Sequence, residues 1–339
     1  MLEIISPDNR RRWNEIVCSM LDYDFYFLAE YHQLDVSGTP LLLHFQEGTL
    51  SIALPVIVRT IEGTVYKDIV SVYGYAGPLI NSRDPEQASV NRFQEELKHF
   101  FDSSSIVSAF SRLHFFFPYQ QHILEGLGTV FDSNYTVGID LTLPQDKQRK
   151  QYASSLKYTI NKLRKKGVIV QKASTGEEID SFVEMYRETM DRVHASEKYY
   201  FSGEYFHRFA DSIDSFILLA YYEGEAVSGA LCTVCNGIMQ HHFGATKNNF
   251  LFLSPLKLIL EEARLLGVRQ GCRILHLGGG FKGNADSLFL FKALFSKQRF
   301  LFKTWKYVHN QEVYDSLVSQ KFKNNIPDSA FFPLYRLTC

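Results

Sequence analysis

The chain has 339 residues, of which 45% are hydrophobic and 14% aromatic, a size that suits about two domains with aromatic-rich cores. A formal net charge of −1 excludes a global field that would draw the protein to nucleic acid or membrane, and five cysteines are too few for a disulfide framework. No apolar run reaches membrane-spanning length and the N-terminal residues lack a secretory signal pattern. We therefore expect a cytoplasmic protein without an integral membrane span.

The first half predicts strands and helices that alternate. In chain order we expect a strand at 2–5, a helix at 8–21, strands at 41–45, 50–59 and 64–73, a helix at 85–101, and strands at 106–110 and 130–141. Glu47-Gly48 and Glu62-Gly63 mark the turns of the three-strand meander.

The second half repeats this order of elements. We expect helices at 145–166, 176–193, 202–213, 254–266 and 287–295, and strands at 168–172, 215–222, 226–235, 238–245, 273–277 and 300–307. A meander followed by helix, strand, helix and strand is similar to the order in the GNAT acyltransferase fold. The sequence thus predicts a mixed α/β protein of two tandem GNAT-like domains, at 1–143 and 144–315, with 316–339 packing back on the first.

A glycine-rich corner follows the predicted strand 273–277. The string ILHLGGG breaks at three glycines, and a helix carrying Phe291 and Lys292 follows. Glycines let the backbone lie against a ligand, so Gly279 is a candidate contact, although the corner could also be a simple connection. The corner carries no P-loop signature, so the sequence gives no support for a P-loop nucleotide site.

The segment 145–166 is strongly basic in a nearly neutral chain. Its charged residues are Asp146 and the basic residues Lys147, Arg149, Lys150, Lys157, Lys162, Arg164, Lys165 and Lys166. Such a helix suits the phosphates of tRNA, an anionic sugar nucleotide or a lipid headgroup, and it could also be a solvated face. We select Lys157, Lys162, Arg164 and Lys165 as candidate tRNA contacts.

Cys232 and Cys235 form a CxxC pair before His241 and His242. On a strand, residues three apart point to opposite faces, and no second CxxC exists, so we predict no metal site. His242, or His241, is better suited to accept a proton from an attacking amine.

Several segments, taken in order, resemble the FemABX family of aminoacyl-tRNA-dependent transferases that extend cell-wall peptides. They are SVYGYAGPL at 71–79, KYTINKLRKKGV at 157–168, YRETMDR at 186–192, HHFGAT at 241–246, and LGG at 277–279 followed by FK at 291–292. The resemblance implies two fused GNAT-like domains and no cofactor. The long coiled-coil arm of some members is absent, because the chain between Tyr200 and Ser215 is too short.

The resemblance also implies roles for individual residues. Lys292 would lie near the transferred aminoacyl ester, with Gly279 and Phe291 beside the substrate. The helical trio Tyr186, Thr189 and Arg192 would contact the acceptor, and Tyr73 and Tyr75 would shape an acceptor groove in the first domain, unless GYAGP is only a turn. His241 stands where relatives carry a tyrosine.

The expected reaction is direct aminolysis, since the sequence holds no GxSxG and no spacing typical of a nucleophilic triad. The acceptor would be an amine of a nucleotide- or lipid-linked glycan precursor. Coenzyme A users of the GNAT fold carry a glycine-rich loop where this chain has NFLFLSPL at 249–256, which favours aminoacyl-tRNA as donor. The alternatives are an acyl-CoA-dependent N-acyltransferase of surface-polysaccharide or natural-product assembly, and a non-catalytic double-GNAT module that only binds.

Overall fold

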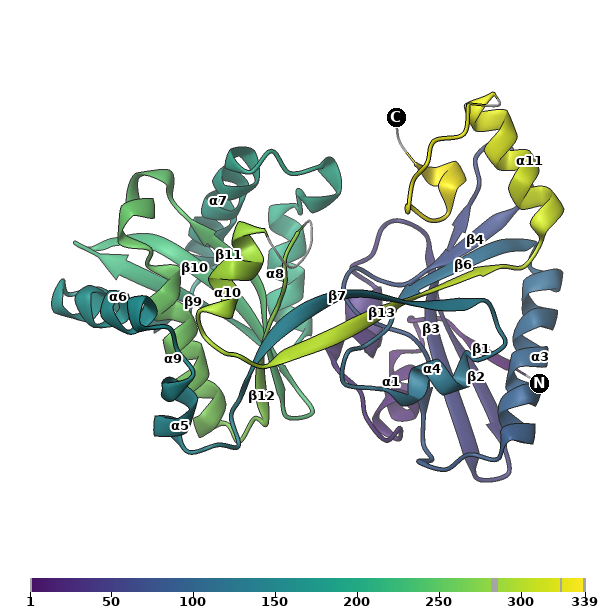
Figure 1. The fold of residues 1–339 in the computed structure, drawn as a ribbon, viewed down its shortest axis with the longest axis horizontal. Coiled ribbons are helices and arrows are strands. Elements are labelled where there is room, and N and C mark those ends of the chain that lie inside the picture. The colour runs from purple at the N-terminus through teal and green to yellow at the C-terminus, as the bar shows by residue number, and fades with distance from the viewer. Residues whose placement is uncertain (1, 282–285, 324, 338–339) are drawn as a thin grey trace. The chain divides into compact units, whose positions relative to one another are not determined.

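The structure, a computed structural model, describes residues 2–281, 286–323 and 325–337. It divides into two compact units, the first formed by Met1–Ser133 with Leu301–Cys339 and the second by Asn134–Phe300. In each unit helices pack on a β-sheet, so the predicted α/β class is confirmed (Figure 1).

The first unit is built on a mixed sheet. Its strands lie in the order β1 (Leu2–Ile5), β2 (Thr39–Glu47), β3 (Leu50–Thr60), β4 (Lys67–Val70), β6 (Ile106–Arg112) and β13 (Arg299–Val308), with β5 (Leu79–Ile80) paired to β3. Only β4 and β6 run parallel among these described pairs. The helical segments are α1 (Arg10–Cys18), η1 (Phe25–Phe27), α2 (Ala29–His32), α3 (Gln87–Ser103), α4 (Tyr119–Ile123), α11 (Gln311–Phe322) and η4 (Leu334–Arg336). Trp13, Phe93, Phe101 and Trp305 are fully buried, which gives this unit an aromatic core.

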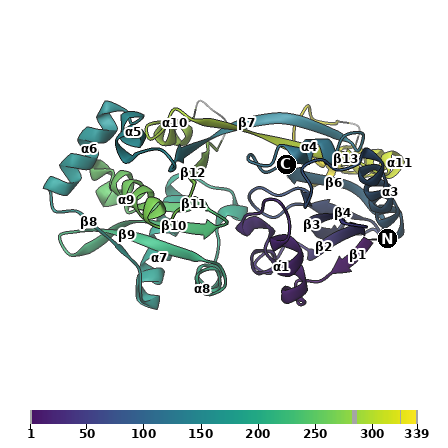
Figure 2. The ribbon, with the colours of Figure 1, turned by 90° about the horizontal axis from the view of Figure 1, so that it is seen from below.

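The second unit has helices on both faces of its sheet (Figure 2). Its strands lie in the order β7 (Thr129–Asp140), β12 (Ile274–Gly279), β11 (Ile238–Thr246), β10 (Glu225–Cys235), β9 (Ser215–Tyr222) and β8 (Ile169–Lys172). One face is covered by α5 (Gln145–Lys150), α6 (Ser154–Lys165) and α9 (Leu256–Arg269), and the other by α7 (Gly176–Arg192) and α8 (Gly203–Ser212). The remaining segments are η2 (Glu197–Tyr199), η3 (Asn248–Leu253) and α10 (Ser287–Ala293).

The two halves of the sequence exchange their last strands. The element order had placed 130–141 at the end of the first domain and 300–307 at the end of the second. In the structure Thr304–Val308 of β13 pairs with β6 of the first unit, and Thr136–Asp140 of β7 pairs with β12 of the second. The units therefore divide at 133/134 and 300/301 rather than at 143/144 and 315/316. An alternating strand pattern specifies which face is buried but not which sheet receives the strand.

Some predicted elements differ in length. The expected helix 145–166 is two helices, because the backbone is not helical at Ala153. The N–H of Ala153 donates to the carbonyl of Leu294 at 2.9 Å. The expected strand 64–73 is reduced to β4, since the chain after Ser71 forms an irregular loop. The helices α4 and α11 were not predicted.

Candidate active site

Within the second unit, the parallel strands β11 and β12 stop pairing part-way along. Their described register joins Ile238–Gln240 to Ile274–His276. Just beyond this paired stretch, each strand has a β-bulge on its other side. His242 is the extra residue where β11 pairs with β10, and Leu277 is the extra residue where β12 pairs with β7. Such bulges redirect side chains and end a ladder. The two adjacent bulges therefore coincide with the point at which β11 and β12 stop pairing with each other.

Lys292 reaches this point from α10, the helix whose first turn is capped by Asp286. The carboxylate Oδ1 of Asp286 accepts from the N–H of Phe289 at 2.7 Å. Lys292 is only 8% exposed, and its Nζ donates to the carbonyl oxygen of Gly279 at 2.7 Å. Burial lowers the pKa of this ammonium to about 8. A Cβ on Gly278, at φ +79°, would lie 3.0 Å from Nζ, so glycine makes room for the amine.

His241 lies close enough to Lys292 for the two side chains to interact electrostatically. Burial first, and then the charge of Lys292, lower the pKa of its imidazole to about 3, so the ring is neutral at physiological pH. Neither ring nitrogen meets hydrogen-bond geometry with a described residue, although the backbone of Leu277 lies near enough to favour the protonated ring slightly. A Cβ on Gly244 would lie 2.7 Å from Nε2, so this glycine admits the ring.

The structure thus brings together three predicted residues: Lys292, His241 and Gly279. The adjacent Phe291 is half-buried and contacts the ring of Phe295, with centroids 5.8 Å apart. A partly desolvated ammonium beside a neutral imidazole can bind a carbonyl oxygen and stabilise the negative charge that develops on it.

His242 lies in a different environment from His241. Its ring stacks on Phe209 of α8, with centroids 5.3 Å apart and an interplanar angle of 26°. Burial lowers its pKa to about 3, the same value as for His241, so the pKa does not distinguish the two rings. The geometry therefore associates His241, rather than His242, with Lys292.

The CxxC pair lies on β10. Cys232 is fully buried, and burial raises the pKa of its thiol to about 12, while Cys235 is half-buried. Among the described residues, no three His, Cys, Asp or Glu side chains gather as metal ligands.

The predicted trio on α7 is engaged in internal hydrogen bonds. The Tyr186 hydroxyl donates to the carbonyl of Tyr199 at 2.7 Å. Arg192 Nη1 donates to the carbonyl of Thr246 at 3.1 Å, and the N–H of Thr246 donates to the hydroxyl of Thr189 at 3.2 Å. The bonds of Arg192 and Thr189 fix the end of β11 to the end of α7.

In the first unit, the segment around Tyr73 and Tyr75 is a closely packed loop. Tyr73 is 38% exposed, while Tyr75 makes an edge-to-face contact with Phe115 at 4.9 Å. Burial raises the pKa of the Tyr75 phenol. Gly74 has φ +125°, and a Cβ there would lie 2.1 Å from the ring of Tyr26, so the glycine is needed to form this turn. The loop presents one tyrosine to solvent and holds the other in place.

The four candidate tRNA contacts all lie on α6. Arg164 is paired with Glu262, with Nη2 2.7 Å from Oε1, whereas Lys162 lines a surface pocket. Lys157 is half-buried and Lys165 is exposed. The basic helix therefore divides into a paired side and a side that faces the pocket.

Other residues of interest escaped the sequence interpretation. Tyr158, Lys162 and Lys166 share one side of the pocket and Phe252 the other. Their spacing of four residues was a usable signal on the helix, but nothing in the sequence indicated that Phe252 lies opposite.

Comparisons with known proteins identify the family. The model of the FemAB family matches residues 72–295, which span every motif of the candidate site. The chain belongs to the FemAB family. No curated protein sequence matches it significantly.

Solved structures share the fold of this chain. The FemAB fold of this chain is similar to the crystal structure of FemX, which is 13% identical and matches over 93% of this chain and 99% of that chain with a TM-score of 0.73. L-PGS from Bacillus licheniformis is 13% identical over 93% and 97% of the two chains, with a TM-score of 0.60. A conserved protein of unknown function from Bacteroides thetaiotaomicron is 8% identical over 91% and 99%, with a TM-score of 0.61.

The predicted architecture of two tandem α/β units is confirmed, and membership of the FemAB family supports an acyltransferase. None of the described helices combines the length and apolar character needed to cross a bilayer.

Proposed function

We propose that this FemAB-family protein transfers an aminoacyl group from an aminoacyl-tRNA to an amine of a cell-envelope precursor. The reaction is a direct aminolysis that requires no cofactor and forms no covalent enzyme intermediate. Membership of the FemAB family supports the reaction class. The protein would act in the cytoplasm, because charged tRNA, its proposed donor, is supplied there.

One observation carries the proposal: the buried Lys292 ammonium bound to the carbonyl of Gly279, beside the neutral ring of His241. The acceptor amine attacks the ester carbonyl, a C–N bond forms, and negative charge moves to the carbonyl oxygen. Lys292 stabilises that charge. The C–O bond to the ribose then breaks, and the proton lost by the amine is taken up by the departing ribose oxygen.

We assign the donor to the second unit and the acceptor to the Tyr73–Tyr75 loop of the first. The acceptor is a nucleotide- or lipid-linked glycan precursor that offers a primary amine. Thr189 and Arg192 serve the site by holding the end of β11, the strand that carries His241, and Tyr186 holds the neighbouring η2 segment through Tyr199.

The test is a donor competition. The protein is incubated with charged tRNA, with acetyl-CoA, or with both, together with an amine-bearing nucleotide-sugar precursor, and the product is analysed by mass spectrometry. A product heavier by one aminoacyl residue supports the proposal. An acetylated product alone would assign the protein to the acyl-CoA-dependent acyltransferases, and an unmodified precursor that still binds would assign it to the binding modules.

A further inference from the structure

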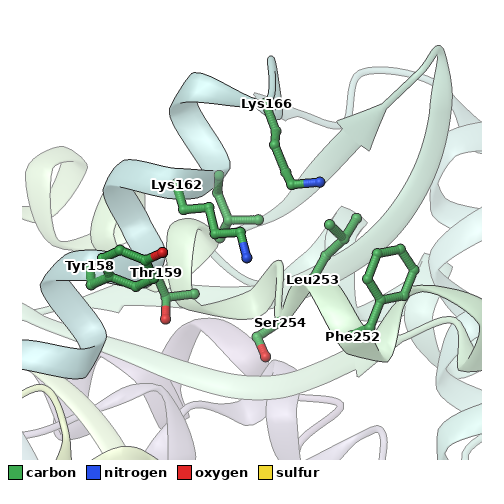
Figure 3. Close-up of a pocket in the computed structure, with 8 residues that line it drawn as sticks. Tyr158, Thr159, Lys162, Lys166, Phe252, Leu253 and Ser254 are labelled. Atoms are coloured by element: carbon green, nitrogen blue, oxygen red, sulfur yellow. The ribbon is translucent and has the colours of Figure 1, made fainter.

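A pocket of about 150 Å³ lies between α6 and the η3 segment of the second unit. Figure 3 shows Lys162 and Lys166 reaching from the helix toward the opposite wall, which is formed by Phe252, Leu253 and Ser254. The lining residues include no acidic side chain. The pocket therefore combines positive charge with aromatic surface.

The helical wall is formed by residues that repeat every four positions. Tyr158, Lys162 and Lys166 fall on one side of α6 and its C-terminal cap. Within the described part of the chain, neither lysine ammonium has a carboxylate within 4 Å, whereas Arg164 of the same helix is paired with Glu262 at 2.7 Å. The two pocket lysines keep their charge available for an anion.

The η3 wall of the pocket is anchored to the core, but the ring of Phe252 is exposed to solvent. Leu253 is buried, and Phe250 packs against the hydrophobic core. Between them Phe252 is 75% exposed, and across the pocket Tyr158 is 69% exposed. Neither ring contributes to the core, so the anchored segment presents two aromatic faces on either side of a basic pocket.

Exposed aromatic rings beside lysines are the usual elements of a single-stranded nucleic-acid site, because bases stack on the rings and phosphates lie on the ammonium groups. The adenine and diphosphate of coenzyme A share this chemistry. Two rings, however, offer stacking faces for successive bases. The N–H groups of Phe250 and Ser254 are already bonded to the carbonyls of Lys247 and Leu251, which leaves them unable to cradle a diphosphate.

We propose that this pocket holds the single-stranded 3′ end of the donor tRNA, with phosphates on Lys162 and Lys166 and bases against Tyr158 and Phe252. The inference rests on the proposed function, since it specifies where that function's donor binds. The connection between the elements supports this inference. β11, which carries His241, continues through Lys247 into η3, which forms one wall of the pocket.

The experiment measures binding of a fluorescein-labelled, 5′-phosphorylated RNA trinucleotide CCA to the full chain by fluorescence anisotropy. One double variant, Tyr158→Ala with Phe252→Ala, removes the rings. A second, Lys162→Gln with Lys166→Gln, removes the charges. The matched control is Lys147→Gln with Lys150→Gln, which removes two exposed charges from the neighbouring α5. Melting temperatures establish that all the variants fold.

The ring variant should weaken binding by about tenfold or more. The lysine variant should reduce the slope of log Kd against log salt concentration by about 1.4, the value for two lost single-strand phosphate contacts. The control should stay within about twofold of the wild type.

Other outcomes separate this inference from the proposed function. Trinucleotide binding that both pocket variants retain, or no binding to the wild type, overturns the inference. Transfer from charged tRNA at the wild-type rate by both pocket variants also overturns it and leaves the proposed function intact. Coenzyme A binding that is lost in the lysine variant, with acetyl transfer and no aminoacyl transfer, overturns both.

Discussion

Lys292 Nζ donates to the carbonyl oxygen of Gly279 at 2.7 Å while the side chain is 8% exposed. A buried ammonium is costly unless its donors are used, and among the residues that the structure describes the Gly279 carbonyl uses only one of the three. The two remaining donors can bind a substrate oxygen. This burial argues against a surface lysine whose stem packs on a neighbouring phenylalanine, and it supports the proposed role of Lys292 beside the substrate.

Lys292→Met removes this charge and keeps the length of the side chain. Because the charge acts on the developing oxyanion, turnover should fall by about 10²-fold, as when an oxyanion donor is lost. The melting temperature should stay the same or rise, since a buried charge is replaced by an apolar group. Single-turnover transfer assays measure the effect, and the exposed Lys297→Met is the matched control. Normal turnover in a folded Lys292→Met variant would return Lys292 to a structural role.

The pH dependence of turnover should also report Lys292. With a pKa of about 8, its ammonium is present below that pH and is lost as the pH rises through it. Turnover should therefore decline above about pH 8, and the residual activity of Lys292→Met should lack this decline. Stability should change in the opposite sense. The folded state loses this proton near pH 8 and the unfolded chain near 10.5, so the free energy of unfolding rises between these values.

Gly278→Ala should damage the site beyond its effect on the backbone. The residue has φ +79°, and the added Cβ would lie 3.0 Å from Lys292 Nζ. Gly271, at φ +70° with open space around its Cβ position, is the matched control. Both substitutions should cost about 1–2 kcal/mol for the left-handed backbone, but only Gly278→Ala should lower turnover per folded molecule. Equal turnover of the two variants would show that the position of Lys292 tolerates the methyl group.

Arg192→Ala should lower the free energy of unfolding by about 1–3 kcal/mol, because the carbonyl of Thr246 loses a charged donor. Turnover, measured in single-turnover transfer assays, should fall as well, because Arg192 holds the end of the strand that carries His241. The exposed Arg187 on the same helix provides the control substitution to Ala. A stability loss with unchanged turnover would show that Arg192 only stabilises the fold and does not serve the site.

The local pattern of the sequence predicted the strands and helices around the site. The alternation in β9–β11 and the glycine corner before Phe291 and Lys292 are short-range signals. They correctly placed Lys292 after the strand that ends at Gly279. Its hydrogen bond to that residue is a tertiary contact, which the local pattern of the sequence does not specify.

Long-range relationships were not available from the sequence. The exchange of β7 and β13 depends on pairing between residues that are far apart in the chain. The positions of Tyr158 and Phe252 on opposite walls depend on how η3 folds against the core. Neighbouring residues on a regular strand, such as His241 and His242, point to opposite faces, but the bulge at His242 changes this alternation locally and could not be predicted from the sequence.

The exchanged strands also bear on how the protein is made. Thr304 pairs with Arg112, so one edge of β6 stays unpaired until β13 is synthesised, about 190 residues later. At ribosomal rates of about 5–20 residues per second, that edge stays open for roughly 10–40 s. An open edge is a template for pairing with other chains. During this interval the nascent protein is exposed to aggregation through the open edge of β6. The exposure ends when β13 is synthesised and pairs with β6.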